Sequence, residues 1–589
     1  MSEQHTPSGS DHSEPRQWTE KLDRTSSIDS ADDDVVEQQN LEPPSHHHGI
    51  DDKILTPQVS RKSQAQSQPS LARRTTSVGT TDPNFEVDWE DEKDPANPRN
   101  WSLAYRCMCL VFLSWNTLVI VLYSTSYTSG ISEMAMEFGT TETVVTLGLT
   151  FYLLGLAAGS LVVAPLSETY GRKPISVVSL FIFVVMIIPC ALATSVAELI
   201  IVRFIAALAG SVMISSAPGM VGDLVDDDHR SLALSIWSLG PINGPVFGPI
   251  IGGFVTQYLG WRWTAWISLI LSGIALVFSC IMKETYAPVL LRRKAARLRK
   301  ETSDPRWWCR YDHKAAFGEV LKTNLSRPFV MMVLEPICIF WNLYIGVIYG
   351  ILYLSFTAYP IVFRQIRGWS IGLSGLAFVG IGIGTVLTIV AEPLIRRMIN
   401  SHKIDPETGK VPPEAMVSVV CISALIIPAG ELMFAWTCSP ASIPWILPLV
   451  AGVPYGAGNT AVFIYATNYL SHSYGIYAAS SLASNSMIRS VMGGIMPLVG
   501  TYMYNRLGAN WSGTLLGLLE VALIPIPFVF WKYGYKIRRR SDFIRAMQED
   551  KKKQERRRSR RVEQQQQQQQ QQQEEEDPAL TRDDPEKQV

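Results

Sequence analysis

Charged residues are scarce in this chain, and several features of soluble enzymes are missing. Only 18% of its 589 residues are charged, whereas 47% are hydrophobic. No GxxxxGK[ST] phosphate loop occurs, which argues against an ATP-driven pump, and no HExxH zinc motif occurs, which argues against a membrane metalloenzyme. The eight cysteines form no CxxC pair, and most stand in apolar segments as small hydrophobic residues. We therefore expect neither an enzyme nor a bound metal.

The two ends of the chain lack apolar residues. Residues 1–84 are rich in Ser, Asp, Gln and Pro and cannot bury enough surface to fold alone, so we predict a disordered cytoplasmic tail. This tail contains no cleavable signal peptide, and its run His46–His48 is not expected to hold a metal. The first apolar helix should therefore act as its own targeting signal. A second cytoplasmic tail, 536–589, is basic, then poly-Gln, then acidic, and its basic start could lie on anionic lipid.

Between the tails, about twelve apolar segments have the ~20 residues that a transmembrane helix needs. The polar stretch 283–328 is predicted to be a cytoplasmic central loop, which divides the helices into one bundle in 85–282 and another in 329–535. The predicted spans are 104–127, 143–166, 174–194, 198–222, 231–257, 263–282, 329–356, 371–393, 414–435, 444–470, 476–503 and 512–534. So many long apolar runs exclude a soluble protein. We predict an all-α integral membrane protein with twelve transmembrane helices in two six-helix bundles.

Basic residues are concentrated in one set of loops. Arg172 and Lys173 follow the second span, and about a dozen basic residues lie between 283 and 328. The other loops hold few. The positive-inside rule therefore places both termini and the central loop in the cytoplasm. Asn510 begins a glycosylation sequon on the opposite side, too close to the membrane for efficient use.

The fifth span contains three Gly-Pro pairs at four-residue spacing, in the sequence GPINGPVFGPIIGG. On a helix the glycines share one stripe, the small-xxx-small pattern that lets two helices approach closely in lipid. A packing seam alone would need the glycines but not the prolines, which remove backbone donors. The repeat is therefore more specific than a lone GxxxG. Its residues are Gly240, Pro241, Gly244, Pro245, Gly248, Pro249, Gly252 and Gly253.

Other motifs complete a family resemblance. The first span is preceded by NPRNWS, and the second span begins with ETVVTLGLTFYLLG and is followed by APLSETYGRKP. The fourth span contains an arginine followed by a glycine. Over roughly residues 85–535 the chain resembles the major facilitator superfamily, and within it the fungal drug:proton antiporters with about twelve spans. The Gly-Pro repeat matches the antiporter motif of that group. In the loop motif GxLaDrxGRK, Ala164 replaces the first glycine and Glu168 the aspartate, a departure that fungal members share.

The resemblance implies roles for several charged residues. Arg203, in the fourth helix, would take part in proton coupling. Glu168, Arg172 and Asp223 would form a cytoplasmic charge cluster that latches one conformation. Two alternatives stay open, because Arg203 could snorkel to the near interface and the cluster could be merely solvated.

No single residue stands out as the acid that binds the coupled proton. The first span, where bacterial relatives often place this acid, contains no Asp or Glu. Glu335 and Glu520 are the deepest acids, and Arg489 is the deep base of the second half; intramembrane charges are functional candidates by default. We expect only these two acids to lie deep enough in the membrane to serve in a central cavity. We favour Glu335 over Glu520, since Pro336 would break the helix beside it.

A substrate cavity is expected near the midplane between the two halves. Aromatic rings with a few amides suit large, flat amphipathic compounds. Most aromatic residues in such helices belong to the core or the interface belt, so the sequence defines only a pool. The pool contains Asn116, Tyr123, Trp341, Asn342, Tyr349, Asn459, Tyr465 and Asn468.

The resemblance implies a proton-driven exporter of drugs, fungicides or self-made secondary metabolites across the fungal plasma membrane. It would act as a monomer on small amphipathic organic compounds, with membrane lipid as its surroundings, the proton gradient in place of a cofactor, and no nucleic-acid partner. A polyamine exporter is one alternative, but it would need several acids in the cavity. A transporter-derived sensor that signals through its tails is another. Sugar import is disfavoured, because no PESPR follows the sixth span.

Overall fold

The computed structural model describes residues 85–90, 94–312, 317–404, 409, 411–541, 543–545, 547 and 549. The predicted tail 1–84, its run His46–His48 and nearly all of the tail beyond Ser541 lie outside the described residues. The described part is helical, apart from loops and an isolated parallel bridge between Glu86 and Trp308.

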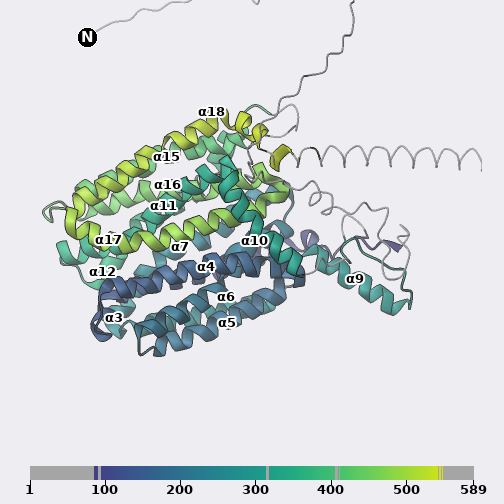
Figure 1. The fold of residues 1–589 in the computed structure, drawn as a ribbon, viewed down its shortest axis with the longest axis horizontal. Helices are drawn as coiled ribbons and strands as arrows, with labels where there is room; N and C mark the ends of the chain where they lie inside the picture. The colour runs from purple at the N-terminus through teal and green to yellow at the C-terminus, as the bar shows by residue number, and fades with distance from the viewer. Residues whose placement is uncertain are drawn as a thin grey trace, which may run out of the picture. The chain divides into compact units, whose positions relative to one another are not determined.

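The first half of the chain forms six long helices that run side by side (Figure 1). They are α2 (Leu103–Ser126), α4 (Glu142–Tyr170), α5 (Arg172–Leu192), α6 (Val196–Leu224), α7 (Asp227–Leu259) and α8 (Arg262–Ile281). A 3-10 turn, η4 (Tyr127–Gly130), and a short helix, α3 (Ile131–Glu137), continue from the end of α2. Gly171 separates α4 from α5 with φ at 112°, a conformation that only glycine adopts easily, so the chain reverses there without strain.

The second half repeats this arrangement with more interruptions. Its elements are α11 (Pro336–Tyr359), the π-helical turn η5 (Pro360–Ile366), α12 (Ile371–Leu376), α13 (Val379–Val390), α14 (Glu392–Asn400), α15 (Glu414–Thr437), α16 (Ile446–Tyr474), η6 (Gly475–Tyr477), α17 (Ala478–Leu523) and α18 (Pro525–Arg540). Helices α12 and α13 together form the candidate span Ile371–Val390, and α14 follows it.

Helix α17 contains two antiparallel segments. At Gly508 the backbone leaves the helical region, with φ 78° and ψ 164°. The Ser512 hydroxyl donates to the Met503 carbonyl at 3.1 Å, although nine residues of continuous helix would separate them by ~13 Å. The chain therefore reverses at Gly508, and the second segment continues through Pro525 into α18.

Ten stretches of the described chain are long and apolar enough to cross a membrane. The last of them, Ala478–Arg540, contains the reversal at Gly508 and so crosses twice. Helix α7 is not among the ten, because its glycines, prolines and polar side chains make it less apolar, but its 33 residues exceed the length of a span. These two additions give the twelve predicted crossings.

Several boundaries differ from the prediction. The seventh helix was expected to begin at 329, but a separate helix α10 (Phe317–Leu334) occupies that stretch and α11 begins at Pro336. The residue before a proline is driven out of the helical region, and Glu335 accordingly has φ −92° and ψ 111°. The stretch 283–328 was expected to be a loop, but it also contains α9 (Ala287–Glu301). At the other end, α18 runs past 535 to Arg540.

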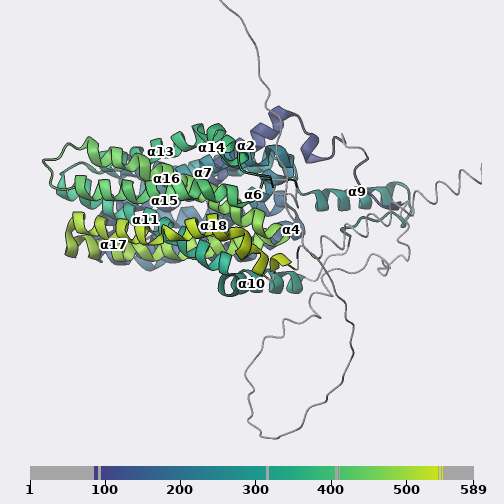
Figure 2. The same ribbon diagram turned by 90° about the horizontal axis from the view of Figure 1, so that it is seen from above.

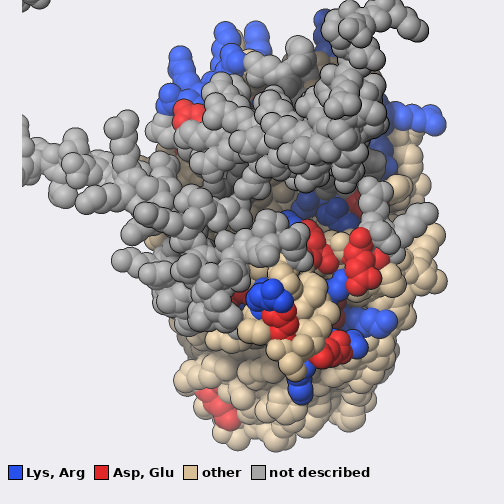
Figure 3. Space-filling model, turned by 90° about the vertical axis from the view of Figure 1, so that its right-hand side faces the viewer, with Lys and Arg blue, Asp and Glu red and all other residues tan. Residues whose placement is uncertain are grey.

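Helix α9 carries a small core of its own. Both ribbon views show it beyond the ends of the long helices (Figures 1 and 2). Val87, from the segment before the first span, packs with Leu291 and Ala295 of α9 and with Cys309. The Val87 amide donates to the Trp308 carbonyl at 2.8 Å. Acidic and basic side chains gather at this end of the molecule (Figure 3), as predicted for its polar loops.

Candidate functional site: the bundle interior and the seam between bundles

Helix α7 packs along α2 through its glycine stripe. A Cβ atom on Gly240 would overlap the Ser114 carbonyl oxygen, and one on Gly244 would lie 2.8 Å from the Val121 Cβ. Real Cβ atoms do not approach so closely, so no larger residue fits at either position. Further along, Gly248 faces Thr125 and Gly252 faces Ser126 in the same way. The predicted close packing within the first bundle is confirmed.

The opposite side of α7 meets the second bundle at α12. A Cβ on Gly375 would overlap the Pro249 carbonyl oxygen, and one on Gly253 would lie 2.9 Å from the Ile371 carbonyl oxygen. The Gln257 side-chain oxygen accepts a hydrogen bond from the Gly372 amide at 2.9 Å. Helix α7 therefore touches α2 on one side and closes against the second bundle on the other.

Arg203 lies inside the first bundle with 1% of its surface exposed, so the snorkelling alternative is wrong. Its Nε donates to the Gly148 carbonyl at 3.1 Å, and its Nη2 to the Tyr123 and Ser124 carbonyls at 3.3 Å each. Three tyrosine rings surround the guanidinium, with centroids 4.1 to 5.0 Å from its central carbon: Tyr127, Tyr123 and Tyr152. No ion pair to Arg203 occurs among the described residues. Carbonyl dipoles and π faces stabilise this cation instead of a carboxylate.

The residues of the predicted charge cluster lie together where α4 meets α5 and α6 ends. The Arg172 guanidinium lies 3.7 Å from an Asp223 oxygen and 3.8 Å from a Glu168 oxygen. Arg172 is buried, but 44% of the Glu168 side chain is exposed, so this second contact is screened by solvent. Arg172 also donates to the Ser167 hydroxyl at 3.2 Å and lies over the Tyr286 ring.

Glu284 belongs to this cluster, and the sequence interpretation missed it. Its carboxylate accepts from the backbone amides of Arg172 at 2.9 Å and Lys173 at 3.2 Å, at the positive end of the α5 dipole. It also accepts from the amides of Thr285 and Tyr286 at 3.1 Å each. Glu284 is buried and lies 112 residues beyond Arg172, so no spacing rule links the two.

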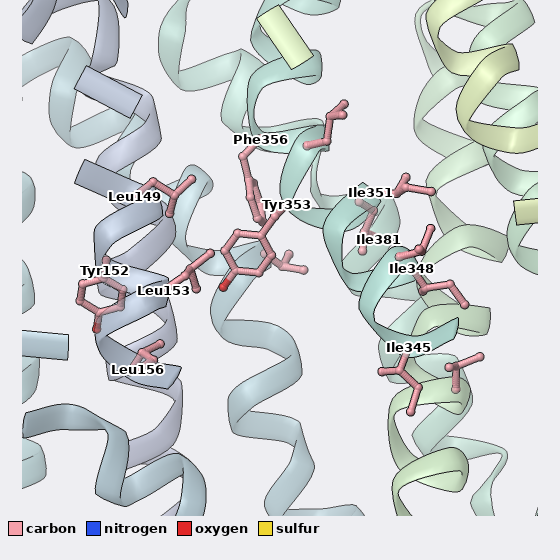
Figure 4. Close-up of a cluster of buried hydrophobic side chains, with 14 of the residues drawn as sticks. Leu149, Tyr152, Leu153, Leu156, Ile345, Ile348, Ile351, Tyr353, Phe356 and Ile381 are labelled. Atoms are coloured by element: carbon pink, nitrogen blue, oxygen red, sulfur yellow. The ribbon is translucent and has the colours of Figure 1, made fainter. Parts of the chain in front are cut away.

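Apolar side chains fill the space between the two bundles at mid-height. Figure 4 shows Leu149 and Leu153 of α4 facing Tyr353 of α11. Two polar contacts cross this apolar layer: the hydroxyls of Ser124 and Tyr353 lie 3.3 Å apart, and the Thr150 hydroxyl donates to the Gly494 carbonyl at 2.8 Å. The bundles are therefore in direct contact at this layer.

A small cavity lies beside this layer, and its walls come from both bundles. It is lined by Ile242, Pro245 and Val246 of α7 and by Leu352, Phe356, Phe378, Ile381, Thr385, Gly456, Asn459 and Thr460 of the second half. Asn459 is the one member of the predicted pool among these residues. Its amide nitrogen is buried and forms no hydrogen bond within the described part of the chain.

The other pool residues do not line this cavity. The Asn116 amide and the Ser279 hydroxyl form a hydrogen bond of 2.8 Å inside the first bundle. Asn342 is hydrogen-bonded to Ser484 at 3.2 Å and to Asn485 at 3.1 Å. The remaining members are placed as follows: Tyr123 lies against Arg203, Trp341 packs on Tyr469 and Phe530, Tyr349 lies between Tyr353 and Arg489, Tyr465 is buried, and Asn468 is half-buried.

The candidate coupling residues of the second bundle lie in three different places. Glu335 stands at the start of α11, where it accepts a hydrogen bond from the Tyr474 hydroxyl at 3.0 Å, so the expectation that it lies deep in the seventh helix is wrong. Arg489 is buried, with the Tyr349 and Phe463 rings each 4.9 Å from its guanidinium carbon. Glu520 lies in the second segment of α17 and is 3% exposed, and neither of its oxygens has a hydrogen-bond partner among the described residues.

A further buried acid, Glu431 of α15, was overlooked. It is 8% exposed, and its neighbour Leu432 packs against Gly517 of the helical segment that carries Glu520. The expectation that only Glu335 and Glu520 are deep enough is therefore wrong. The signal was present, because Glu431 stands inside the predicted span 414–435. The sequon residue Asn510 already donates its amide to the Ser439 carbonyl at 3.0 Å, and its glycosylation stays a prediction of low use.

Comparison with known proteins gives the family. The model of the Major Facilitator Superfamily matches residues 107–497. The chain belongs to this superfamily. A solved structure of the proton:xylose symporter XylE shares the fold, with a TM-score of 0.53 at 15% identity over 74% of this chain and 96% of that one. The protein is thus a multi-pass membrane transporter and not an enzyme.

Three relatives at 38% identity are fungal. The citrinin biosynthesis cluster transporter mrr1 of Monascus ruber is 38% identical over 78% of this chain and 92% of its own. The efflux pump MFS2 of Trichophyton rubrum is 38% identical over 79% and 78%, respectively. The multidrug transporter mdrA of Aspergillus fumigatus is also 38% identical, over 79% and 77%. This superfamily transporter therefore resembles fungal multidrug and secondary-metabolite exporters.

Proposed function

We propose that this protein exports small amphipathic organic compounds, either drugs or fungal secondary metabolites, in exchange for protons. It would act as a single chain in the plasma membrane, with both termini cytoplasmic. The observation that carries the proposal is the α2–α7 seam, in which four glycines of the antiporter motif allow close packing: Gly240, Gly244, Gly248 and Gly252. The relatives at 38% identity support the substrate class.

Alternating access gives the charged residues their roles. The Arg172 cluster would hold the cytoplasmic ends of α4, α5 and α6 together in one conformation and release them in the other. Arg203 would keep a permanent positive charge inside the first bundle, because it is held by carbonyls and not by an acid that could neutralise it. Glu520 suits the coupled proton better than Glu335, since its oxygens lack partners. Arg489 would be the matching cation of the second bundle.

The cavity between the bundles has a volume of about 20 Å³, so it would have to open before a substrate could enter; its lining would then favour an apolar or aromatic compound. Its residues are aliphatic, aromatic, threonine or amide, and none of them is acidic. A polyamine carries several positive charges and would need carboxylates to replace its hydration shell. The lining therefore supports export of flat amphipathic compounds rather than of polyamines.

Transport by the purified protein in liposomes tests the proposal. Citrinin and rhodamine are suitable probes, with an imposed pH gradient as the driving force. We expect accumulation of at least one probe that disappears when the gradient is collapsed by a protonophore. Equal transport with and without the gradient would overturn proton coupling.

Spermidine as a third probe tests the polyamine alternative. A chain lacking 1–84 and 540–589 tests the sensor alternative, which intact efflux with lost signalling would favour.

A further inference from the structure

We infer that Glu431 and Glu520 form one proton-binding pair inside the second bundle and that this pair holds the exchanged proton. The inference rests on the proposed proton-coupled export and names its proton site. Helix α15 and the second segment of α17 pack closely through small residues. A Cβ on Gly517 would lie 2.7 Å from Leu432 Cδ2, and one on Gly513 would lie 2.7 Å from Ala435 Cβ. This antiparallel register brings Glu520 to within about one turn of Glu431.

The pair has no cation. Five titratable side chains of the surrounding helices interact electrostatically with one or both carboxylates. They are Tyr344 and Tyr359 of α11, Tyr455 of α16, Tyr504 of α17 and Cys438 beside the end of α15. None of these is basic, and no Lys, Arg or His of the described chain forms an ion pair with either acid. Other buried acids of this half do have such partners: Glu414 pairs with Arg538 at 2.7 Å, and Glu392 with Arg396 at 2.7 Å.

Two facing carboxyl groups without a cation cannot both stay ionised in a membrane interior. Each ion would lose its hydration, and the two like charges would repel each other in a medium of low dielectric constant. Binding one proton removes the repulsion and allows one carboxyl to donate to the other. The pair then takes up and releases its protons as a unit rather than as two independent acids.

Two tyrosine hydroxyls beside the pair can serve its ionised state. Tyr344 and Tyr455 are both buried, and neither hydroxyl has a hydrogen-bond partner within the described residues. Tyr455 acts on both carboxylates. These hydroxyls can donate hydrogen bonds to a carboxylate after it has released its proton, and such bonds would stabilise the ionised form.

Tyr455 also connects the pair to the central cavity. It stands four residues before Asn459 on α16, and residues at this spacing are neighbours on a helix surface. Asn459 lines the cavity with an unpartnered amide nitrogen. A substrate that engages Asn459 would therefore change the surroundings of Tyr455, and through it those of the acidic pair. This gives a physical route by which substrate and proton exclude each other.

Infrared titration of the purified transporter tests the pair without any substrate, because a protonated carboxyl in an apolar site has its own carbonyl stretching band. We expect one such band in the wild-type transporter. It should vanish in Glu520→Gln and move in Glu431→Gln. It should persist in Glu335→Gln and in Glu301→Gln, a change at an exposed acid of α9. A band that is unchanged in both pair variants would overturn the inference, as would one removed by Glu335→Gln alone.

Transport separates this inference from the proposed function. If wild-type export depends on the pH gradient, we expect the rate of gradient-driven export to fall at least tenfold in Glu431→Gln and in Glu520→Gln. Both variants should still exchange the probe across the membrane when the pH is equal on the two sides. Retention of gradient-driven export in both variants would overturn the inference and leave the function standing. If wild-type export ignores the gradient, the proposed coupling fails, and with it the pair's role in exchange, whatever the infrared bands show. Folding of each variant is checked by its melting temperature.

Discussion

The central carbon of the Arg203 guanidinium lies 4.1 Å from the centre of the Tyr127 ring. The Tyr127 hydroxyl is occupied by the Val145 carbonyl at 2.7 Å, which fixes the ring against the cation. Two helices of the first bundle are thus tied to α6 through a single charge that has no acidic partner.

Substitution of Arg203 should therefore abolish coupling without removing the protein from the membrane. Arg203→Ala is expected to eliminate gradient-driven export at normal surface expression. Arg203→Lys keeps the charge but cannot reproduce the planar fork that reaches the carbonyls of Gly148, Tyr123 and Ser124, so a loss of about tenfold is expected, equivalent to ~1.4 kcal/mol. Export assays with surface labelling measure both effects, and normal export by Arg203→Ala would exclude a coupling role.

The α2–α7 seam should be intolerant of even one added carbon. Gly248→Ala places a methyl group on the Thr125 hydroxyl, so it should lower the melting temperature and reduce export, and Gly244→Val should block the approach of the helices. Gly273 of α8 is the matched control, since a Cβ there meets nothing within 4 Å. Gly273→Ala should be neutral or stabilising by up to ~1 kcal/mol, as expected for glycine replaced within a helix. Equal melting temperatures for Gly248→Ala and Gly273→Ala would contradict the close packing.

Glu284 should matter more for stability than the better-recognised Glu168. Removal of the Glu284 carboxylate leaves the buried amides of Arg172 and Lys173 without acceptors, at a cost of about 1–3 kcal/mol. Glu168 is 44% exposed and lies 3.8 Å from Arg172, so its removal should cost no more than ~1 kcal/mol. Thermal unfolding of Glu284→Ala and Glu168→Ala compares the two, and the reverse order would refute this ranking.

The contact between the segment before the first span and α9 should weaken in acid. Burial opposes ionisation of Asp94, but the amides of Ala96 and Glu90 and the Lys294 ammonium outweigh it and hold the pKa of Asp94 below its usual value. Because the pKa of Asp94 is lower in the folded chain than in the unfolded chain, its ionised form stabilises this contact at pH values above the unfolded pKa. This stabilisation is lost as the pH falls below about 4 and through the folded pKa.

Cys309 reports on this contact, because it is buried in the same small core. Its reaction with dipyridyl disulfide should be slow at neutral pH, accelerate below pH ~4, and be fast at neutral pH in Lys294→Ala. The exposed thiol of Cys107 serves as the internal control. Peptide mass spectrometry resolves the two sites. Equal rates for Cys309 in the wild type and Lys294→Ala would show that the ion pair does not hold the segment.

Local patterns in the sequence were sufficient for the helices and for the glycine stripe. Apolar runs and glycine spacing are properties of one helix, and a membrane allows little else for such segments. Arg172 and Glu168 were also predictable, since they stand four residues apart at one turn. The meeting of Glu284 with Arg172, or of Glu431 with Glu520, depends on helices that pack in space, and nothing in the spacing encodes that packing.

The proline beside Glu335 shows a different limit. The rule that a residue before proline leaves the helix was applied correctly, but the break separates two helices instead of opening a site within one. The substrate pool failed for a related reason. Rings and amides of the same composition serve as core, and only packing decides that Asn342 is fully bonded while Asn459 faces a cavity.

The tight fit of α7 on α2 determines where motion between the bundles can occur. Since the glycines of α7 pack directly onto α2, we expect these two helices to move as one body, so that any change in the angle between the bundles falls on the opposite side of α7. There the Pro249 carbonyl meets Gly375 backbone to backbone. Backbone atoms have no side-chain rotamers that could adjust in small steps, so the Pro249 carbonyl and the Gly375 backbone are either in contact or separated. The gate at this end of the transporter should accordingly act as a latch with two positions and not as a graded valve.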